Sequence, residues 1–172
     1  MSEIDSGVFR QVLGAYPTGV TVVASPYGDA TDTARAMIIG SFGSVSLDPP
    51  LVQFMPAKSS KTWEEMAPAG KYCVNVLAGD QKDVCNKFFV KDVDPFSEVE
   101  WEMTENGSPR IAGCLAWIDC NVWETVDAGD HWIVIGEVVA MGHNGPEDGD
   151  DAGCVGEPLL FFKGGYGTFQ EL

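Results

Sequence analysis

The sequence predicts a mostly-β protein whose strands form a barrel, with short helices packed outside it. At least six segments of the 172-residue chain are strand-like, being rich in β-branched and aromatic residues between Gly, Pro, Asn or Asp. The two longest, 114–126 and 131–141, are joined by Asp127-Ala128-Gly129-Asp130, which is a strong hairpin signal. Two or three further segments have the pattern of short helices. No internal repeat or linker divides the sequence, so we expect residues 1–172 to form a single domain.

The N-terminal region predicts a short helix followed by a strand. Ser6 is an expected N-cap, the apolar residues of VFRQVL recur at i,i+4 spacing, and Gly14 is an expected stop. Residues 17–19 (Pro-Thr-Gly) then predict a turn into the β-branched strand 20–24.

A loop and two strand-like segments follow. Residues 25–34 are rich in Asp, Gly and Thr and predict a loop. In 36–47 the apolar run is interrupted by Ser41 and Gly43, which indicates a strand that meets a bulge or a ligand. Residues 51–55 (LVQFM) predict another strand.

The next elements are a helix, a strand and a second helix. Thr62 and Glu65 are in capping-box register, so we expect a helix to begin near residues 60–62. YCVNVLA (72–78) predicts a strand, and the polar residues after it open a second helix over about 80–89.

Two loops and a last strand complete the expected order. Residues 92–110 predict an acidic loop anchored by Phe96 and Trp101. The Gly- and Asp-rich residues 142–157 predict a mobile loop, and PLLFF (158–162) predicts the last strand.

The charge of the chain excludes several classes of partner. It carries 26 acidic and 10 basic residues, a net charge of −16, which repels nucleic acids and anionic membranes. The acidity is explained by a solubilising surface. Residues 1–10 lack the pattern of a signal peptide, and no apolar stretch is long enough to span a membrane, so we expect a cytoplasmic protein. Six of the ten basic residues form a local cationic zone that could hold a small anion: Lys58, Lys61, Lys71, Lys82, Lys87 and Lys91.

The cysteines and histidines argue against a disulfide scaffold and a metal centre. The five cysteines are an odd number without a CxxC pair, and the only histidines are His131 and His143. Cys73 and Cys120 lie in apolar runs and are expected in the core.

Three segments are candidates for chemistry, each with a structural alternative. Lys58-Ser59-Ser60-Lys61-Thr62, between a strand and a helix start, suits a phosphate group, but its hydroxyls could equally cap the helix. The small residues of 36–41 would let a planar ligand approach the backbone, or they mark a bulge. His131, after Gly129-Asp130, could contact a ligand at the hairpin tip or be an ordinary surface histidine. No Ser/His/Asp set, Walker loop or GxGxxG motif is present.

Seven blocks in sequence order carry a resemblance to a known family. They are FRQVLGAYPTGVTVV (9–23), SFGSVSLDPPLVQF (41–54), KSSKTWEEM (58–66), YCVNVL (72–77), GSPRIAGCLAWIDCNV (107–122), AGDHWIVIGEV (128–138) and PLLFFKGGYG (158–167). This series resembles the flavin reductase-like family, the short reductase components of two-component flavin-dependent monooxygenases. The likeness is strongest to reductases that serve hydroxylases of phenolic or steroid-derived aromatic rings.

The resemblance implies an FMN-binding split β-barrel, a homodimer, and reduction of FMN or FAD by NADH or NADPH, with the reduced flavin passed to a partner monooxygenase. His131 would stand near the nicotinamide as the catalytic-site residue. The residues that would bind the flavin are Ala36, Met37, Ile38, Gly40 and Ser41 along the ring and ribityl chain, Met55, Pro56, Ala57, Lys58, Ser59, Ser60, Lys61 and Thr62 around the ribityl and phosphate, Lys87 at the rim, and Tyr166 near the nicotinamide.

The chain departs from the family pattern at two of these positions. The family commonly has Thr in place of Ile38 and Asn, Ser or Gln in place of Gly40, so two side-chain hydrogen bonds to the flavin cannot form here. Each would contribute about 0.5–1.5 kcal/mol. The departure motivates a second hypothesis, a flavin-binding or carrier module that has the same barrel and does not catalyse reduction.

Overall fold

The computed structural model describes residues 4–28, 33–90, 93–145 and 153–172. The expected loops 25–34 and 142–157 and the acidic loop 92–110 therefore lie partly outside the described residues, and Lys91 lies wholly outside them. At the described edges of the 142–157 loop, the Asn144 side chain holds Val155 through two hydrogen bonds, of 2.7 and 2.9 Å, to its backbone.

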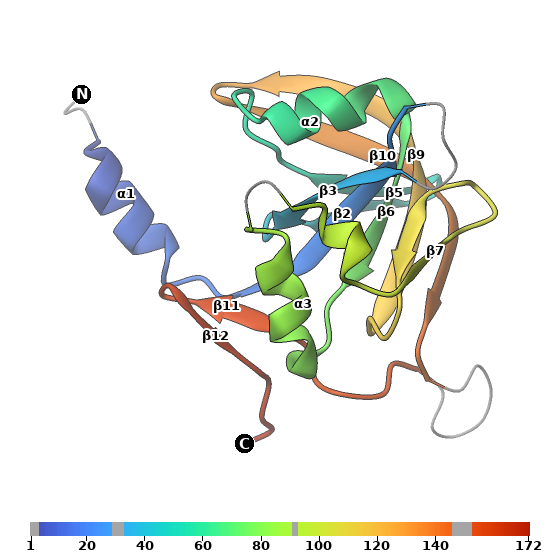
Figure 1. The fold of residues 1–172 in the computed structure, drawn as a ribbon. Coiled ribbons are helices and arrows are strands. Elements are labelled where there is room, and N and C mark those ends of the chain that lie inside the picture. The colour runs from blue at the N-terminus through green and yellow to red at the C-terminus, as the bar shows by residue number, and fades with distance from the viewer. Residues whose placement is uncertain (1–3, 29–32, 91–92, 146–152) are drawn as a thin grey trace.

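A seven-stranded antiparallel sheet forms the body of the molecule, in the order β3-β2-β6-β9-β10-β5-β4 (Figure 1). Its strands are β2 Thr21–Pro26, β3 Ala34–Ile39, β4 Gly43–Leu47, β5 Pro50–Phe54, β6 Lys71–Val76, β9 Ala116–Ala128 and β10 His131–His143. The predicted hairpin is confirmed, because His131 pairs with Ala128 at its tip. The single interrupted strand predicted in 36–47 is wrong, because residues 40–42 separate two strands, β3 and β4.

That break closes the barrel. β3 and β4 are the two edges of the sheet, yet only residues 40–42 join them. Seven flat strands would span about 29 Å, from six spacings of about 4.8 Å, whereas this link reaches about 14 Å at most. The sheet must therefore curl until its edges approach. They are not neighbours in the sheet order, so the barrel is split at the segment expected to meet a ligand.

The interior of the barrel is filled by one apolar cluster. Phe54 is fully buried and packs edge-on against Trp63 and Tyr72, with ring centroids 5.5 and 5.0 Å apart. Cys73 and Cys120 are fully buried, as expected. Burial raises the pKa of the Cys120 thiol to about 12, so it is protonated at neutral pH.

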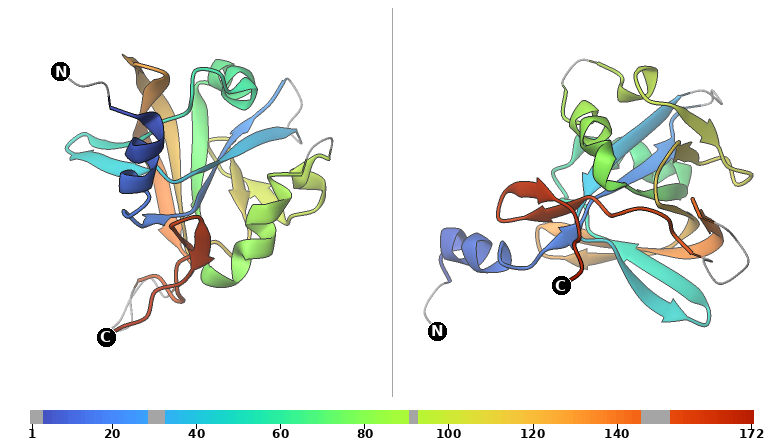
Figure 2. Two further views of the ribbon diagram at one scale, coloured as in Figure 1. Left: turned by 90° about the vertical axis from the view of Figure 1, so that its left-hand side faces the viewer. Right: turned by 90° about the horizontal axis from the view of Figure 1, so that it is seen from below.

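The helix α1 (Ser6–Leu13) begins where the sequence predicts, but its cap differs. Asp5, not Ser6, is the N-cap, and its carboxylate accepts hydrogen bonds of 2.9 Å from the backbone N–H groups of Gly7 and Val8. None of the residues of α1 is buried, and the helix stands away from the barrel in Figures 1 and 2.

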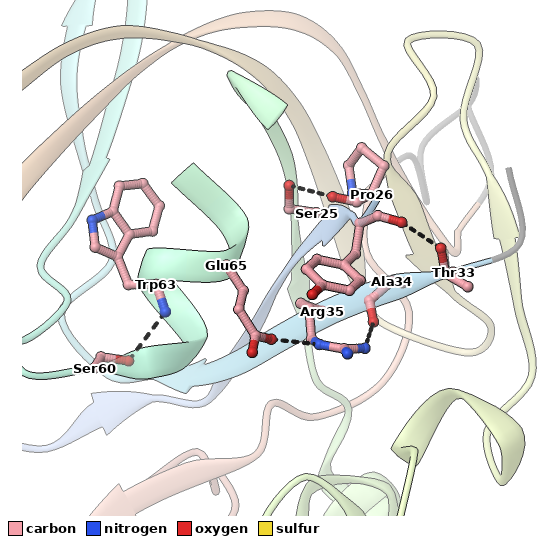
Figure 3. A network of polar contacts seen from close by, with 9 residues as sticks. Ser25, Pro26, Thr33, Ala34, Arg35, Ser60, Trp63 and Glu65 are labelled. Carbon is pink, nitrogen blue, oxygen red and sulfur yellow. Dashed lines mark hydrogen bonds and ion pairs between the residues drawn. The ribbon is translucent and has the colours of Figure 1, made fainter. Parts of the chain in front are cut away.

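The remaining helices are short and cover the barrel. They are α2 Lys61–Met66, η1 Ala67–Ala69, η2 Gly79–Gln81, α3 Lys82–Lys87 and η3 Pro95–Ser97. The expected capping box of Thr62 and Glu65 is wrong by two residues, because Ser60 caps α2 by accepting from Trp63 N at 3.2 Å. Glu65 instead pairs with Arg35 of β3 at 2.6 Å (Figure 3), which fixes α2 against the sheet.

Two small sheets complete the fold. β1 (Thr18–Gly19) pairs with β11 (Leu160–Phe162), which pairs with β12 (Gly165–Gly167). The turn expected at 17–19 is thus partly strand. β7 (Trp101–Met103) and β8 (Pro109–Ile111) form a hairpin inside the expected acidic loop, where Phe96 is buried and Trp101 Nε1 donates to its carbonyl at 3.0 Å. The aromatic anchors are therefore confirmed.

Within the described ranges, none of the helices is long and apolar enough to cross a membrane. The same residues contain no group of three or more His, Cys, Asp or Glu side chains that could hold a metal ion.

Candidate functional site

The two segments expected to hold a flavin meet at Ser41. Its hydroxyl accepts a hydrogen bond of 3.0 Å from Met55 N, and Gln53 Nε2 donates to its carbonyl at 3.1 Å. The link between β3 and β4 is therefore tied to the loop that follows β5. This contact brings the two segments 36–41 and 55–62 together.

The hairpin tip meets the same loop from the other side. Trp132 N donates to the Pro56 carbonyl and Lys58 N donates to the Asp130 carbonyl, both at 2.9 Å. Ala57 forms a bridge with His131 between these bonds. His131 therefore lies beside the loop expected to hold the phosphate.

The hydroxyl and cationic groups of this loop are not equivalent. Ser60 caps α2 (Figure 3), and Lys58 Nζ pairs with Asp127 at 2.5 Å while lying 4.7 Å from the centre of the Trp132 ring. The Lys58 hydrogen bond holds the pKa of the exposed Asp127 carboxyl below its usual range. Lys61 is exposed and has no ion pair with any residue in the described part of the chain. Of the two cations, Lys61 is the one available to an anionic ligand.

His131 is half exposed and bonded to its neighbour. Its Nδ1 lies 2.7 Å from Asp130 Oδ1, and this contact lowers the pKa of the Asp130 carboxyl. Since Nδ1 is engaged, the other ring nitrogen, Nε2, is the atom that can face a ligand.

A pocket of about 320 Å³ lies along β3 near the split. Three predicted residues line it, Ile38, Gly40 and Tyr166, and the remaining lining residues are Thr18, Gly19, Val20, Ile39, Phe89 and Phe161. Ligand pockets usually measure about 300–1,000 Å³ and have mostly apolar walls. This pocket therefore has the size and character expected for a planar ring with apolar faces.

Tyr166 contributes its ring rather than its hydroxyl to this pocket. The hydroxyl lies 3.4 Å from Cys85 Sγ, which is fully buried, and this contact together with burial raises the pKa of Tyr166 to about 12. The ring packs edge-on against Phe161 with centroids 5.4 Å apart. Tyr166 is thus a neutral wall residue at physiological pH.

Two predicted residues point elsewhere. Met37 packs against the barrel interior, whereas its neighbours Ala36 and Ile38 pack on the outside. Met37 can therefore approach a ligand only through its backbone. Lys87 Nζ is 2.5 Å from the Glu98 carbonyl and 3.9 Å from its carboxylate, and it does not line the pocket.

Sequence reasoning missed Thr18, Phe89 and Phe161. Thr18 pairs with Phe161 in the β1–β11 ladder, a contact between residues far apart in the chain. A two-residue strand after Pro17 has no periodicity to detect, and Phe89 follows α3 as an ordinary apolar residue. These side chains line one pocket only because segments far apart in the sequence, such as β1 and β11, pair in the fold.

A larger hollow of about 810 Å³ lies elsewhere, between the end of β2 and α2. Its lining includes Tyr27, Glu64, Glu65 and Met103, and none of the predicted site residues. We therefore place the candidate site at the smaller pocket, which Ile38, Gly40 and Tyr166 line, and at the adjoining loop, which Ser41 contacts at Met55.

The flavin reductase like domain family matches residues 13–170 of the chain. A flavin reductase from Pseudomonas putida is 48% identical over 171 residues, covering 99% of this chain and 94% of that protein. The reductase subunit HsaB of a flavin-dependent monooxygenase from Mycobacterium tuberculosis is 39% identical, covering 96% of this chain and 83% of that protein.

Two solved structures are similar over nearly their whole lengths. Nitrilotriacetate monooxygenase component B from Mycobacterium thermoresistibile superposes with a TM-score of 0.85 at 37% identity, covering 96% of this chain and 87% of that one. The NADH:FAD oxidoreductase SgcE6 from Streptomyces globisporus, in complex with NAD and FAD fragments, has a TM-score of 0.82 at 32% identity, with coverages of 99% and 98%.

Proposed function

Because this chain belongs to the flavin reductase-like family, we propose that residues 1–172 form one domain that reduces FMN or FAD with NADH or NADPH and supplies the reduced flavin to a separate monooxygenase. The chain is an NAD(P)H:flavin oxidoreductase with the split-barrel fold of its relatives. The observation that carries the proposal is the family match over 13–170, with a ligand-sized pocket at the predicted segment.

The residues around the pocket fit a flavin. Its walls are apolar and aromatic, and Gly40 adds no side chain of its own to the β3–β4 link, where the neighbouring side chain is that of Thr18. β3 is an edge strand, so among the described residues alternate N–H and C=O groups along it have no strand partner and can meet the polar edge of the ring. When bound, the flavin and the nicotinamide supply the hydride chemistry themselves. The protein binds the ring, orients it and excludes water.

His131 has the role of positioning the nicotinamide substrate. Its bridge to Ala57 and its bond to Asp130 hold the ring at the edge of the site. Imidazole there can hydrogen-bond the carboxamide or a pyrophosphate oxygen of NAD(P)H. Transfer of a hydride needs no base, so proton transfer is not assigned to it.

His131→Ala is expected to lower kcat/KM for NAD(P)H about tenfold, a loss of about 1.4 kcal/mol. The flavin dissociation constant should stay unchanged, since the histidine acts on the other substrate. Steady-state kinetics and flavin titration measure the two quantities. His143→Ala, the same change at the far end of β10, is the matched control. Loss of flavin binding with unchanged NADH kinetics would make His131 a structural hairpin residue.

We propose a homodimer as the working form. The support is α1, whose face of Val8, Phe9, Val12 and Leu13 is more than half exposed although these residues are large and apolar. A helix that buries no residue on its own chain gains little stability by itself. A second copy of the chain covers this face through a symmetric contact.

Light scattering should therefore give a mass near twice the 18.5 kDa of the chain. Replacing Phe9 and Leu13 together with Asp should bring the mass to that of one chain, because two charges would enter the apolar contact. Gln11→Asp, which adds one charge to the same helix outside that face, is the control. A wild-type mass near 18.5 kDa at micromolar concentration contradicts the dimer.

The partner is a flavin-dependent monooxygenase, as the names of the relatives support. A cytoplasmic location fits this role, because the cysteines of the described residues are free thiols, as in reducing compartments.

Oxidation of NADH or NADPH, followed in air with added FMN or FAD, tests the proposed reaction. We expect turnover with at least one pair. Flavin binding without oxidation of either nicotinamide would instead identify the carrier module, which the names of the relatives do not favour.

A further inference from the structure

Thr18 of β1 and Gly40, which follows β3, line the same pocket and lie next to each other. A Cβ atom built on Gly40 would lie 2.9 Å from Thr18 Oγ1 and 3.5 Å from Thr18 Cβ. Real Cβ atoms essentially never approach a neighbour this closely. A residue other than glycine at position 40 would therefore displace the Thr18 hydroxyl from its present position.

The Thr18 hydroxyl is free to bind a ligand. It makes no hydrogen bond with any residue in the ranges 4–28, 33–90, 93–145 and 153–172. The only other polar side chain that lines this pocket is Tyr166, whose hydroxyl is bonded to Cys85. Among the described residues, Thr18 thus carries the one side-chain group in this pocket that can form a new hydrogen bond.

We propose that Thr18 is a flavin-binding residue of this chain. Its hydroxyl forms a hydrogen bond with the flavin in place of the polar side chain that position 40 lacks. The proposal rests on the proposed function, since the ligand is the flavin ring. A hydroxyl both donates and accepts. It can therefore bond either an acceptor or an N–H group on the edge of the ring.

The arrangement also explains the glycine. A polar residue at position 40 would carry its own hydroxyl or amide from the β3–β4 link, whereas here the same region is reached from β1. Thr18 is held there by the pairing of β1 with β11, opposite Phe161. In this chain the hydrogen-bonding hydroxyl is on β1, and Gly40 leaves room for it.

Thr18→Val is the direct test, because valine keeps the shape of threonine and suits a strand but has no hydroxyl. We expect the dissociation constants of FMN and FAD, measured by fluorescence titration, to rise about three- to tenfold. Thr18→Ser, which restores the hydroxyl, should bind within about twofold of wild type. Thr125→Val, the same change at an exposed position of β9, should leave flavin binding unchanged.

A second experiment, which moves the hydroxyl from position 18 to position 40, tests independently whether the two side chains would occupy the same place. Thr18→Ala should bind as weakly as Thr18→Val, and adding Gly40→Ser to it should restore binding by moving the hydroxyl to position 40. Gly40→Ser alone should not improve binding, since its side chain would displace the Thr18 hydroxyl. Melting temperatures show that each variant is folded.

Wild-type binding by both Thr18→Val and Thr18→Ala, or tighter binding by Gly40→Ser alone, would overturn the proposal. These results would not bear on whether the wild-type protein is a reductase. The proposed function would instead be contradicted if the wild-type protein bound neither flavin or oxidised neither nicotinamide.

Discussion

Replacing Gly136 with Ala is expected to destabilise the protein by about 3 kcal/mol, because the barrel interior has no room for one more carbon at this point. Gly136 lies in the middle of β10, and a Cβ atom there would lie 2.0 Å from Tyr72 Oη and 3.0 Å from Cys120 Cβ. Tyr72 is 1% exposed and packs against Phe54. It cannot turn aside without opening the core, so the strain must be spread over the sheet.

Denaturant unfolding of the variant measures this loss as a change in the free energy of unfolding. Tyr72→Phe in the same chain should recover part of it by removing Oη, but not all, because Cζ would still be 2.7 Å from the new methyl group. Gly165→Ala is the control, since the nearest atom to its Cβ is 3.7 Å away. An unchanged free energy of unfolding for Gly136→Ala would refute this packing of the barrel.

Replacing Lys61 with Glu is expected to weaken flavin binding at least tenfold. Lys61 is the exposed cation of the loop expected to hold the flavin phosphate, and it has no ion pair with a described residue, unlike Lys58. A charge-assisted hydrogen bond to phosphate contributes about 1.5–3 kcal/mol, and the carboxylate would add repulsion. Replacing Ser60 and Thr62 together with Ala should have a similar effect.

Fluorescence titration measures the affinity of each variant, and circular dichroism should show unchanged secondary structure. Lys61→Glu is the cleaner variant, because loss of the Ser60 cap alone costs about 1 kcal/mol of stability in α2. Arg10→Glu on α1 changes the net charge equally and controls for the overall field. An unaltered flavin affinity in Lys61→Glu would show that the flavin phosphate does not bind at this loop.

The strands could be predicted from sequence because their patterns are local. The β-branched run of β2 and the turn chemistry at Gly129 each specify an element without help from distant residues. The helix caps were less certain, because Asp5 and Ser6 are both good N-caps and the choice between them depends on backbone geometry. The two-residue strand β1 could not be predicted, since its partner β11 lies some 140 residues away in the sequence.

The candidate site, too, could be predicted only in part from the sequence. The resemblance assigned residues 36–41 and 55–62 to one flavin, and the Ser41–Met55 contact shows that the two segments lie next to each other. It could not predict which lysine of the loop is free, because that depends on Asp127 of the hairpin. Nor could it predict Thr18, whose importance follows from the space that Gly40 leaves open.

Anaerobic mixing of the protein with NADH or NADPH and an excess of FMN or FAD tests directly whether the protein reduces flavin and releases it. We expect one nicotinamide to be consumed for each flavin reduced, over many turnovers, and the reduced flavin to pass through a filter that retains the protein. If neither NADH nor NADPH is consumed with either flavin, the protein has no reductase activity. Reduced flavin that stays entirely with the protein would contradict its supply to a separate monooxygenase.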